Sequence, residues 1–502
     1  MSLSMPARLQ PQAGTEAPPS RKMSGLNVLP EEMHGLEAQY FARITDDPLT
    51  GAFARKTAVH PGMGGSMLEP DAVPAQVEKL RGLERRGRAA AYVHLPFCES
   101  KCLYCGFFGG KYSPEAGAAY VEALIGEIES ERSLASVGAA PVNALYLGGG
   151  TPTALRAHEL KRLLETLRSV LPLANDCEIT VEGRIHHFDE EKMEACLEGG
   201  ANRFSIGVQS FDTKIRQRLG RIASKEDVRA RLERLASYNH AAVIIDLIYG
   251  LPGQTLADWE EDIRTFLALP LDGVDLYQLN IFPNSELAKA VASGKVPATA
   301  TLAEQGGFFE RGVTLMREAR CRRLSMSHWG RTSRERNIYN PLVKGRADCL
   351  QYGAGAGGSL QGWFMFNESN VERYLRRCTS EEKPVAMVAA PPEDLPVMRV
   401  ILEQMEQCRL NLDDVGAGLA LCGRGESGTV SPQALYAPLL ENWKEAGLVT
   451  QDGPWVELTL AGQFWQVNLA QALIGWQRHY EQGVSKTCIG NMRAISKPPC
   501  LR

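Results

Sequence analysis

The 502-residue sequence has no long hydrophobic run. Its most apolar stretch, residues 241–251, is far shorter than the roughly 20 residues that a membrane-spanning helix needs, and it contains Asp246. The opening residues, MSLSMPARLQPQAG, also lack the apolar core of a secretory signal peptide. We therefore expect a cytoplasmic protein that has no membrane partner.

The sequence also lacks an excess of charge of either sign. Its formal net charge is -4, whereas proteins that bind nucleic acids carry a basic domain or stripe. The short basic run at residues 81–88 is typical of a solvated helix face. We therefore expect no nucleic-acid partner. Hydrophobic residues make up 44% of the chain and charged residues 23%, which predicts an ordinary globular protein of several domains.

A disulfide framework is missing as well. Most of the 12 cysteines are dispersed along the chain, and Cys488 and Cys500 have no partner at ligand spacing. Dispersed cysteines usually serve as small apolar residues. The exception is the group formed by Cys98, Cys102 and Cys105, which has the spacing C-x3-C-x2-C.

The pattern of the sequence divides the chain into four regions. Residues 1–88 are rich in Pro, Gly, Met and charged residues, and their apolar residues do not recur with a sustained helical or strand period. This composition predicts an extension that is partly disordered at its start. Residues 89–378 contain a regular alternation of short apolar runs and amphipathic segments. Residues 379–480 contain helical segments followed by two short runs around the turn 451–454, which predicts a hairpin and a winged-helix-like domain. Residues 481–502 form a tail.

The alternation in the second region determines the predicted fold class. Strand–helix–strand repeats predict an α/β fold with a parallel sheet, and about six repeats predict a partial barrel of TIM type. In such barrels the reactive groups lie at the C-terminal ends of the strands. Gly148–Pro152, Glu182, Gln209 and Asp246 each fall at or just after the end of a predicted strand, so we expect them on one rim. The predicted strands are residues 91–95, 144–147, 178–181, 203–208, 243–248 and 273–279.

The cysteine triplet follows the first of these strands. Thiolates are the ligands of iron-sulfur clusters, and a saturated [4Fe-4S] cluster takes four of them. Three cysteines therefore leave one iron open for another ligand, as in catalytic metal sites generally. A zinc site is the alternative, but it requires a fourth Cys or His at close spacing, and none lies in the loop after Cys105.

Together with the preceding Tyr92-Val-His94-Leu-Pro96-Phe97, the triplet resembles the radical SAM superfamily, and in particular its oxygen-independent coproporphyrinogen oxidase-like (HemN-like) branch. The resemblance covers residues from about 90 to 480. It implies a partial (β/α)6 barrel and a [4Fe-4S] cluster on Cys98, Cys102 and Cys105. The open iron would chelate S-adenosylmethionine (SAM), and one electron would split SAM to give a 5′-deoxyadenosyl radical. A low-potential electron donor such as a flavodoxin or ferredoxin is implied as a partner.

Further positions match this branch one by one. Independently of the resemblance, a glycine turn lets backbone approach a ligand, Arg221 offers a two-pronged donor to a carboxylate, and Asp246 needs a partner within its apolar run. An ordinary salt bridge or helix cap is the alternative role for each polar residue. The SAM-binding residues that the resemblance implies are Tyr92, Gly149, Gly150, Thr151, Glu182, Gln209, Arg221 and Asp246.

Three functions occur in this branch. This sequence lacks motifs that are typical of two of them, and these two functions are therefore disfavoured. Enzymes that oxidatively decarboxylate coproporphyrinogen III carry an extra cysteine two residues after the third ligand, where this sequence has Phe107. Haem chaperones carry a His-Asn-x-x-Tyr-Trp stretch late in the barrel. The corresponding residues 334–341 lack the histidine and the Tyr-Trp pair.

The third function is that of the anaerobic haem-degrading methyltransferases. Residues 182–189, 275–280 and 332–358 contain stretches that resemble this group. The resemblance implies that the enzyme opens the haem ring at a meso carbon, transfers a methyl group from SAM and releases the iron, which leaves a linear tetrapyrrole. We therefore expect haem or a related tetrapyrrole as the substrate. A coproporphyrinogen III dehydrogenase or a haem chaperone remains the alternative.

Residues that contact haem are harder to identify. His186 and His187 lie just past Glu182 and are candidates for ligating iron or contacting a propionate, with a solvated histidine pair as the alternative. His328, next to Trp329 on a strand-like run, is a second candidate for contacting haem. Its alternative role is that of a packed core histidine. The other candidates are Arg184 for a propionate, and Phe107 and Phe108 for the face of the ring.

Overall fold

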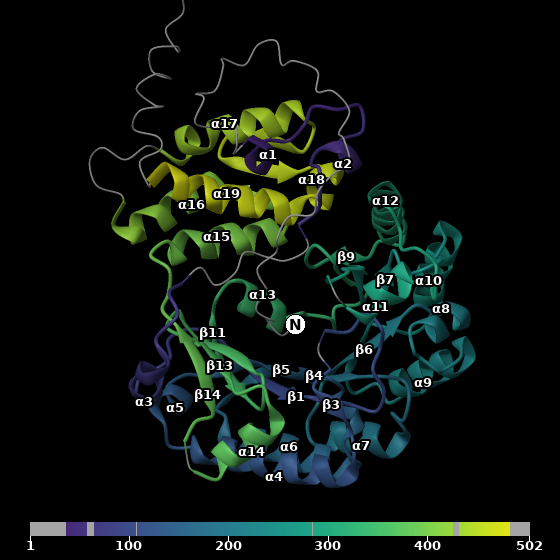
Figure 1. Cartoon of the computed structure of the whole chain (residues 1–502), viewed down its shortest axis with the longest axis vertical. Coiled ribbons are helices and arrows are strands. Elements are labelled where there is room, and N and C mark those ends of the chain that lie inside the picture. The colour runs from purple at the N-terminus through teal and green to yellow at the C-terminus, as the bar shows by residue number, and fades with distance from the viewer. Residues whose placement is uncertain are drawn as a thin grey trace, which may run out of the picture.

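The computed structural model describes residues 37–57, 65–106, 108–283, 285–380, 382–424 and 431–481. These residues form one large sheet with helices on its outer side, together with a smaller C-terminal module (Figure 1). Phe107, the start of the predicted extension, the tail after residue 481, and Cys488 and Cys500 within it lie outside the described residues.

Six parallel strands occupy the middle of a 12-stranded sheet whose order is β14-β13-β12-β11-β1-β4-β5-β6-β7-β8-β10-β9. Consecutive members of the six pair in parallel, and each connection contains a helix, which confirms the predicted partial (β/α)6 barrel. The six strands are β1 (Ala89–Leu95), β4 (Val142–Gly149), β5 (Leu173–Gly183), β6 (Arg203–Gln209), β7 (Ala242–Tyr249) and β8 (Gly273–Gln278).

The outer helices owe their positions to amphipathic sequence. In α6 (Ala157–Val170), the fully buried leucines Leu160, Leu163, Leu164 and Leu167 recur every three or four residues, so one face of the helix packs on the sheet. Figure 1 shows the outer helices around the sheet, from its side away from the C-terminal module to its right-hand edge in the view. They also include α4 (Pro114–Ser130), α7 (Glu190–Glu198), α9 (Lys225–Ser237) and α10 (Leu256–Ala268).

The barrel does not close, because both of its edge strands pair with other segments. On one side β1 pairs in parallel with β11 (Asp348–Tyr352). On the other side β8 pairs antiparallel with β10 (His328–Gly330), which in turn pairs with β9 (Arg322–Arg323). Helix α13 (Tyr339–Lys344) contacts β1, β4 and β11 as well as the C-terminal module, so it lies between the sheet and that module (Figure 1).

The large sheet continues past residue 378, where the sequence pattern predicted the barrel region to end. The antiparallel strands β12 (Gly357–Leu360), β13 (Trp363–Asn367) and β14 (Val385–Ala389) extend it beyond β11. Val385 and Val388 of β14 pack with Val73, Val77 and Leu80 of α3 (Val73–Arg81). Burial of this apolar strand against both β13 and α3 therefore assigns it to the sheet.

The C-terminal module has the predicted helices and hairpin. Three helices combine with a three-stranded sheet of order β15-β17-β16, which is the arrangement of a winged helix. Two further helices, α18 (Leu460–Phe464) and α19 (Gln466–Glu481), follow it. The winged-helix elements are α15 (Leu395–Glu406), β15 (Arg409–Asn411), α16 (Leu412–Leu419), α17 (Pro432–Glu445), β16 (Val449–Asp452) and β17 (Trp455–Leu458).

Part of the predicted N-terminal extension belongs to this module. The segment 37–57 contains the short helices α1 (Glu37–Tyr40) and α2 (Pro48–Gly51), which lie beside α17, α18 and α19 (Figure 1). Tyr40 is fully buried, and its carbonyl oxygen accepts a hydrogen bond from Trp443 Nε1 at 3.0 Å. The ring of Tyr40 also meets Trp476 edge-on, with 5.7 Å between the centroids. This segment thus completes the core of the C-terminal module.

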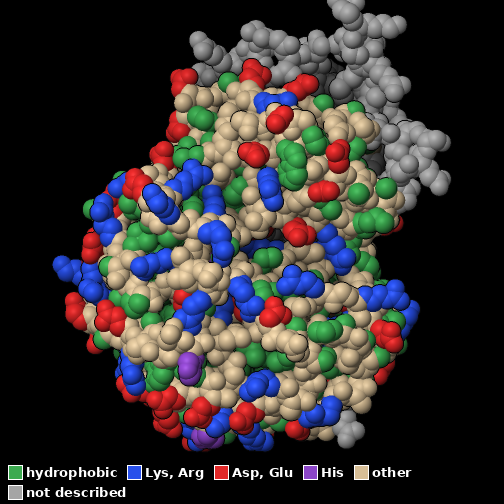
Figure 2. Space-filling model, turned by 180° about the vertical axis from the view of Figure 1, so that it is seen from behind, with side chains coloured by type: hydrophobic (Ala, Val, Ile, Leu, Met, Phe, Trp, Pro, Cys, Tyr) green, Lys and Arg blue, Asp and Glu red, His purple; other side chains and the backbone are tan. Residues whose placement is uncertain are grey.

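Within the described residues, no helix is both long and apolar enough to cross a membrane. On the face shown in Figure 2, hydrophobic side chains are scattered in small groups, and Lys and Arg side chains gather in the band below the C-terminal module.

Candidate active site

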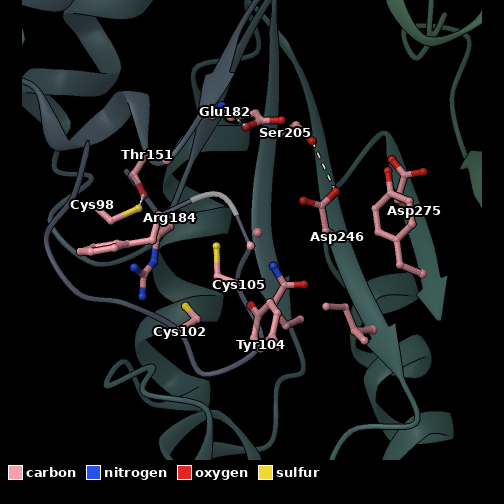
Figure 3. A pocket seen from close by; sticks show the side chains of 18 of the residues that line it. Cys98, Cys102, Tyr104, Cys105, Thr151, Glu182, Arg184, Ser205, Asp246 and Asp275 are labelled. Atoms are coloured by element: carbon pink, nitrogen blue, oxygen red, sulfur yellow. Dashed lines mark hydrogen bonds between the residues drawn. The ribbon is translucent and has the colours of Figure 1, made fainter. Parts of the chain in front are cut away.

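A cavity of about 350 Å³ lies at the C-terminal ends of the parallel strands. Figure 3 shows that Glu182, Asp246 and Asp275 face it from the strands, whereas the cysteines face it from the loop after β1. The common rim that the sequence predicted is therefore present. The predicted cluster ligands and SAM-binding residues line this cavity together: Cys98, Cys102, Cys105, Tyr92, Gly149, Gly150, Thr151, Glu182, Gln209, Arg221 and Asp246.

The cysteine loop is held at both ends. Cys98 ends the short strand β2 (Phe97–Cys98), which pairs with β3 (Gly110–Lys111) beyond the loop. Thr151 donates a hydrogen bond from Oγ1 to Cys98 Sγ at 3.2 Å, and Cys105 N donates to Cys102 O at 3.1 Å. Figure 3 shows the three sulfur atoms around a common space at one end of the cavity. The loop therefore presents its three thiols together.

The glycine turn after β4 lies against the segment that leads into the cysteine loop. Gly149 has φ +115°, a region that favours glycine, and a Cβ atom on Gly150 would lie 2.5 Å from the carbonyl oxygen of Phe97. Gly150 N donates to Leu95 O at 2.7 Å, and Thr151 N donates to Phe97 O at 2.8 Å. The glycines are thus required for the close packing of two backbone segments at the rim.

Polar groups on the cavity wall are oriented by their neighbours. Glu182 accepts hydrogen bonds from Tyr146 Oη at 2.6 Å and from Gly149 N at 3.2 Å. Arg221 is buried and donates to Tyr104 Oη at 3.1 Å and to the carbonyl oxygen of Gly207. The carboxylate of Glu182 and the guanidinium of Arg221 are therefore fixed in position. The wall of the cavity thus offers both an anionic acceptor and a cationic donor.

Gln209 has two unusual features. Its backbone adopts φ 72°, which non-glycine residues rarely do, at a register shift between β6 and β7. Its Oε1 atom is buried, and no group among the described residues donates a hydrogen bond to it. Because a buried acceptor without a donor is unfavourable, this atom is suited to a ligand that supplies one.

A network of buried charges adjoins the cavity through Asp275. His328 is completely buried, with Nδ1 2.6 Å from Asp275 Oδ2 and Nε2 2.9 Å from Glu335 Oε1. Arg203 donates from Nε to Glu335 Oε2 at 3.0 Å. Burial alone would lower the pKa of His328, but Asp275 and Glu335 raise it to about 9. His328 is therefore an imidazolium at neutral pH and donates to both carboxylates.

The two aspartates on the wall differ in protonation. Asp246 and Asp275 are register partners on β7 and β8. Burial raises the pKa of Asp246, and the negative charges of Asp275 and Glu182 raise it further, to about 7. Burial alone would also raise the pKa of Asp275, but His328 outweighs it and the pKa lies below the ordinary value. Asp275 is thus ionised at neutral pH, while Asp246 is close to its midpoint and accepts a hydrogen bond from Ser205 Oγ at 3.4 Å.

Several residues of the wall were not predicted. Tyr146, Asp275 and Tyr277 line the cavity, as do Arg203 and Ser205 on β6. For β6 a signal was present in the sequence. Residues 203, 205, 207 and 209 face the cavity, whereas residues 204, 206 and 208 are buried in the apolar core, as the period of two in a strand requires.

The predicted haem contacts have mixed outcomes. Arg184 and Phe108 line the cavity, and Phe107 lies outside the described residues. His186 and His187 are not part of the described cavity wall, and the side chain of His187 is 59% exposed, as in the solvated alternative. His328 is the packed core histidine of the alternative reading, because both its ring nitrogens are engaged by carboxylates.

Comparison with known proteins identifies the family. The model of the radical SAM superfamily matches residues 92–266. Anaerobilin synthase of Escherichia coli O157:H7 is 42% identical over 384 residues, which cover 76% of this chain and 83% of that protein. Heme chaperone HemW of Bacillus subtilis (strain 168) is 27% identical over 387 residues, covering 77% of this chain and 99% of that protein.

Among solved structures, coproporphyrinogen III oxidase (HemN) from Escherichia coli, a radical SAM enzyme, has the same fold. It superposes with a TM-score of 0.67 and 21% identity over 83% of this chain and 96% of that structure. The chain belongs to the radical SAM superfamily, in the family that includes anaerobilin synthase, and its cofactors are a [4Fe-4S] cluster and SAM.

Proposed function

We propose that this chain is a radical SAM enzyme of anaerobic haem degradation, which opens the haem ring by SAM-dependent methyl transfer and releases the iron. The observation that carries the proposal is its 42% identity to anaerobilin synthase over 83% of that protein. Phe107, at a position where the decarboxylating relatives carry a cysteine, supports it further.

Cys98, Cys102 and Cys105 would hold the cluster, and the loop already presents the three thiols to one space. When bound, the cluster and SAM supply the reductive cleavage that generates a 5′-deoxyadenosyl radical. Gln209 Oε1 would accept a hydrogen bond from SAM, for which it has no described protein donor. Glu182 and Asp246 would accept from ribose hydroxyls or the ammonium group, and Arg221 would donate to the methionyl carboxylate.

The tetrapyrrole needs apolar walls with a few cationic groups, because it combines a flat apolar ring with carboxylates. Phe108 and Phe282 provide apolar surface in the cavity, and Phe282 is 46% exposed, which places it at an open part of the wall. Arg184 lies near the cysteine loop and would pair with a propionate. An exposed phenylalanine at the opening provides a surface on which the ring can stack.

We infer a low-potential electron donor such as a flavodoxin or ferredoxin, since each reductive cleavage consumes one electron. We also infer a cytoplasmic enzyme. No disulfide joins the cysteines that the structure describes, as is usual in reducing compartments.

The decisive experiment is an anaerobic incubation of the reconstituted enzyme with SAM, a low-potential reductant and either haem or coproporphyrinogen III. We expect the Soret band of haem to fall only when SAM and reductant are both present. Free Fe(II) should appear. With SAM that carries an isotopic label on its methyl carbon, mass spectrometry should find a linear tetrapyrrole that contains the labelled carbon.

Other outcomes identify the other functions of the branch. Haem that stays bound and intact, while 5′-deoxyadenosine forms in the same tube, would refute haem degradation and support a chaperone. Release of CO2 from coproporphyrinogen III, with haem untouched, would instead indicate the dehydrogenase.

Arg221→Ala should weaken SAM binding by about 1.5 to 3 kcal/mol, the usual contribution of hydrogen bonds to a charged group, which is roughly 10- to 150-fold in Kd. Anaerobic calorimetry of the cluster-loaded protein measures the change. Arg218→Ala is the matched control, because Arg218 donates to Pro252 O nearby but does not line the described cavity wall. Equal affinities of the two variants would remove Arg221 from the SAM site.

A further inference from the structure

Three potential metal ligands gather beside the cysteine loop. One carboxylate oxygen of Glu99 and one ring nitrogen each of His186 and His187 all lie within 4.8 Å of one another. His187 Nε2 is 3.8 Å from Glu99 Oε2, and the two imidazole centroids are 3.7 Å apart. The side chains of Glu99 and His187 are 29% and 59% exposed, so an ion from solvent can reach them.

The proximity of the two imidazoles depends on an unusual backbone conformation. Consecutive residues of an extended chain point to opposite sides, which would separate the rings. His187 instead has φ 58°, within a turn in which Phe188 N donates to Ile185 O at 3.3 Å. Residues other than glycine rarely adopt this region, and such conformations concentrate at functional sites. The turn thus brings both rings to the side that faces Glu99.

Glu99, His186 and His187 lie next to the cavity wall, but they are not part of the described wall. Glu99 lies between Cys98 and Ser100, and His186 lies two residues after Arg184. Ser100 and Arg184 both line the cavity, and Arg184 donates from Nη1 to Ser100 O at 2.8 Å. This hydrogen bond ties the two loops together, so the three ligands lie next to residues of the cavity wall.

We propose that Glu99, His186 and His187 form a site for a divalent first-row metal ion, and that it receives the Fe(II) freed from the tetrapyrrole. Two imidazoles and one carboxylate are a ligand set that suits Fe(II) and leaves positions open for water. The source of the iron rests on the proposed function, whereas the metal site itself does not. In the transfer, iron leaves the ring nitrogens as Fe(II), two protons from solvent replace it there, and no electron moves.

Metal binding is tested with Mn(II). Because Mn(II) binds such sites more weakly than Fe(II), the measured affinity is a lower bound for that of Fe(II). The full-length enzyme is reconstituted and its cluster kept as diamagnetic [4Fe-4S]2+, so that the EPR signal of free Mn(II) reports binding. We expect one equivalent to bind, and the H186A/H187A double variant to bind about 100-fold more weakly or worse, because ligand loss exceeds the usual effect of outer-shell changes.

The matched control is H158A/H240A, which removes two exposed histidines elsewhere and should bind Mn(II) as the unaltered enzyme does. Wild-type enzyme that binds no Mn(II), or a double variant that binds it equally well, would overturn the site.

The source of the ion is tested by turnover with 57Fe-haem followed by anaerobic gel filtration. We expect about one equivalent of 57Fe to stay with the unaltered enzyme and to be lost from H186A/H187A, while both consume haem at similar rates. Equal 57Fe on the two proteins would overturn the transfer. If haem is not consumed at all while Mn(II) binds through the histidines, the proposed function fails with the transfer, and the metal site stands.

Discussion

The Cys102→Ala variant should contain no [4Fe-4S] cluster and show no turnover. The structure offers three thiols at one end of the cavity, and a cluster that already has an open iron is not retained by two of them. Unaltered reconstituted protein should hold about four irons and four sulfides per chain, with a brown absorbance that air bleaches. Iron and sulfide analysis, together with assay of 5′-deoxyadenosine, measures the loss.

Cys196→Ala is the control for the general effect of removing a thiol. Cys196 lies in α7, is completely buried in the apolar core and is far from ligand spacing with any other cysteine. This variant should keep its cluster and its activity. A Cys102→Ala protein with full iron content and full turnover would contradict the ligand assignment.

His328→Gln should destabilise the folded protein by about 3–5 kcal/mol, the usual effect of removing one member of a buried ion pair. Without the imidazolium, the carboxylates of Asp275 and Glu335 lose the cation between them while remaining buried. The thermal unfolding midpoint at pH 7 measures the loss. His240→Gln, at an exposed position, should leave the midpoint unchanged. Equal midpoints for the two variants would contradict a stabilising role for the His328 imidazolium.

The same network predicts how stability depends on pH. The folded-state pKa of His328 is raised from 6.5 to about 9, so its contribution is complete below pH 6.5 and is lost as the pH rises through about 9. The unfolding midpoint of the unaltered protein should therefore fall between pH 7 and pH 10. The His328→Gln variant should show a smaller fall over that range, since it lacks the group that releases the proton.

The barrel and its rim were predictable because their signals are local. Each strand is a short apolar run, and the residues at the strand ends meet because parallel strands place their C-terminal ends together. The alternation of polar and apolar residues along β6 is equally local, and it would have identified Arg203 and Ser205 as part of the wall.

The charge network was not predictable in the same way. Its members come from β6, β8, β10 and the loop before α13, and His328 and Asp275 are separated by 53 residues. No local pattern distinguishes His328 from an ordinary core histidine. Only the antiparallel pairing of β10 with β8, which opposes His328 to Asp275, brings the imidazole to that carboxylate.

The docking of residues 37–57 has a consequence for the order in which the protein folds during synthesis. Trp443 and Tyr40, which share a buried hydrogen bond, are 403 residues apart in the chain. The barrel strands are all made before α17 and α19, so the barrel can fold on the ribosome while Tyr40 still lacks its aromatic partners. Tyr40 can therefore be buried only after α17 and α19 have been made, late in translation. Because its burial awaits the last helices, the C-terminal module is the final part of the protein to fold.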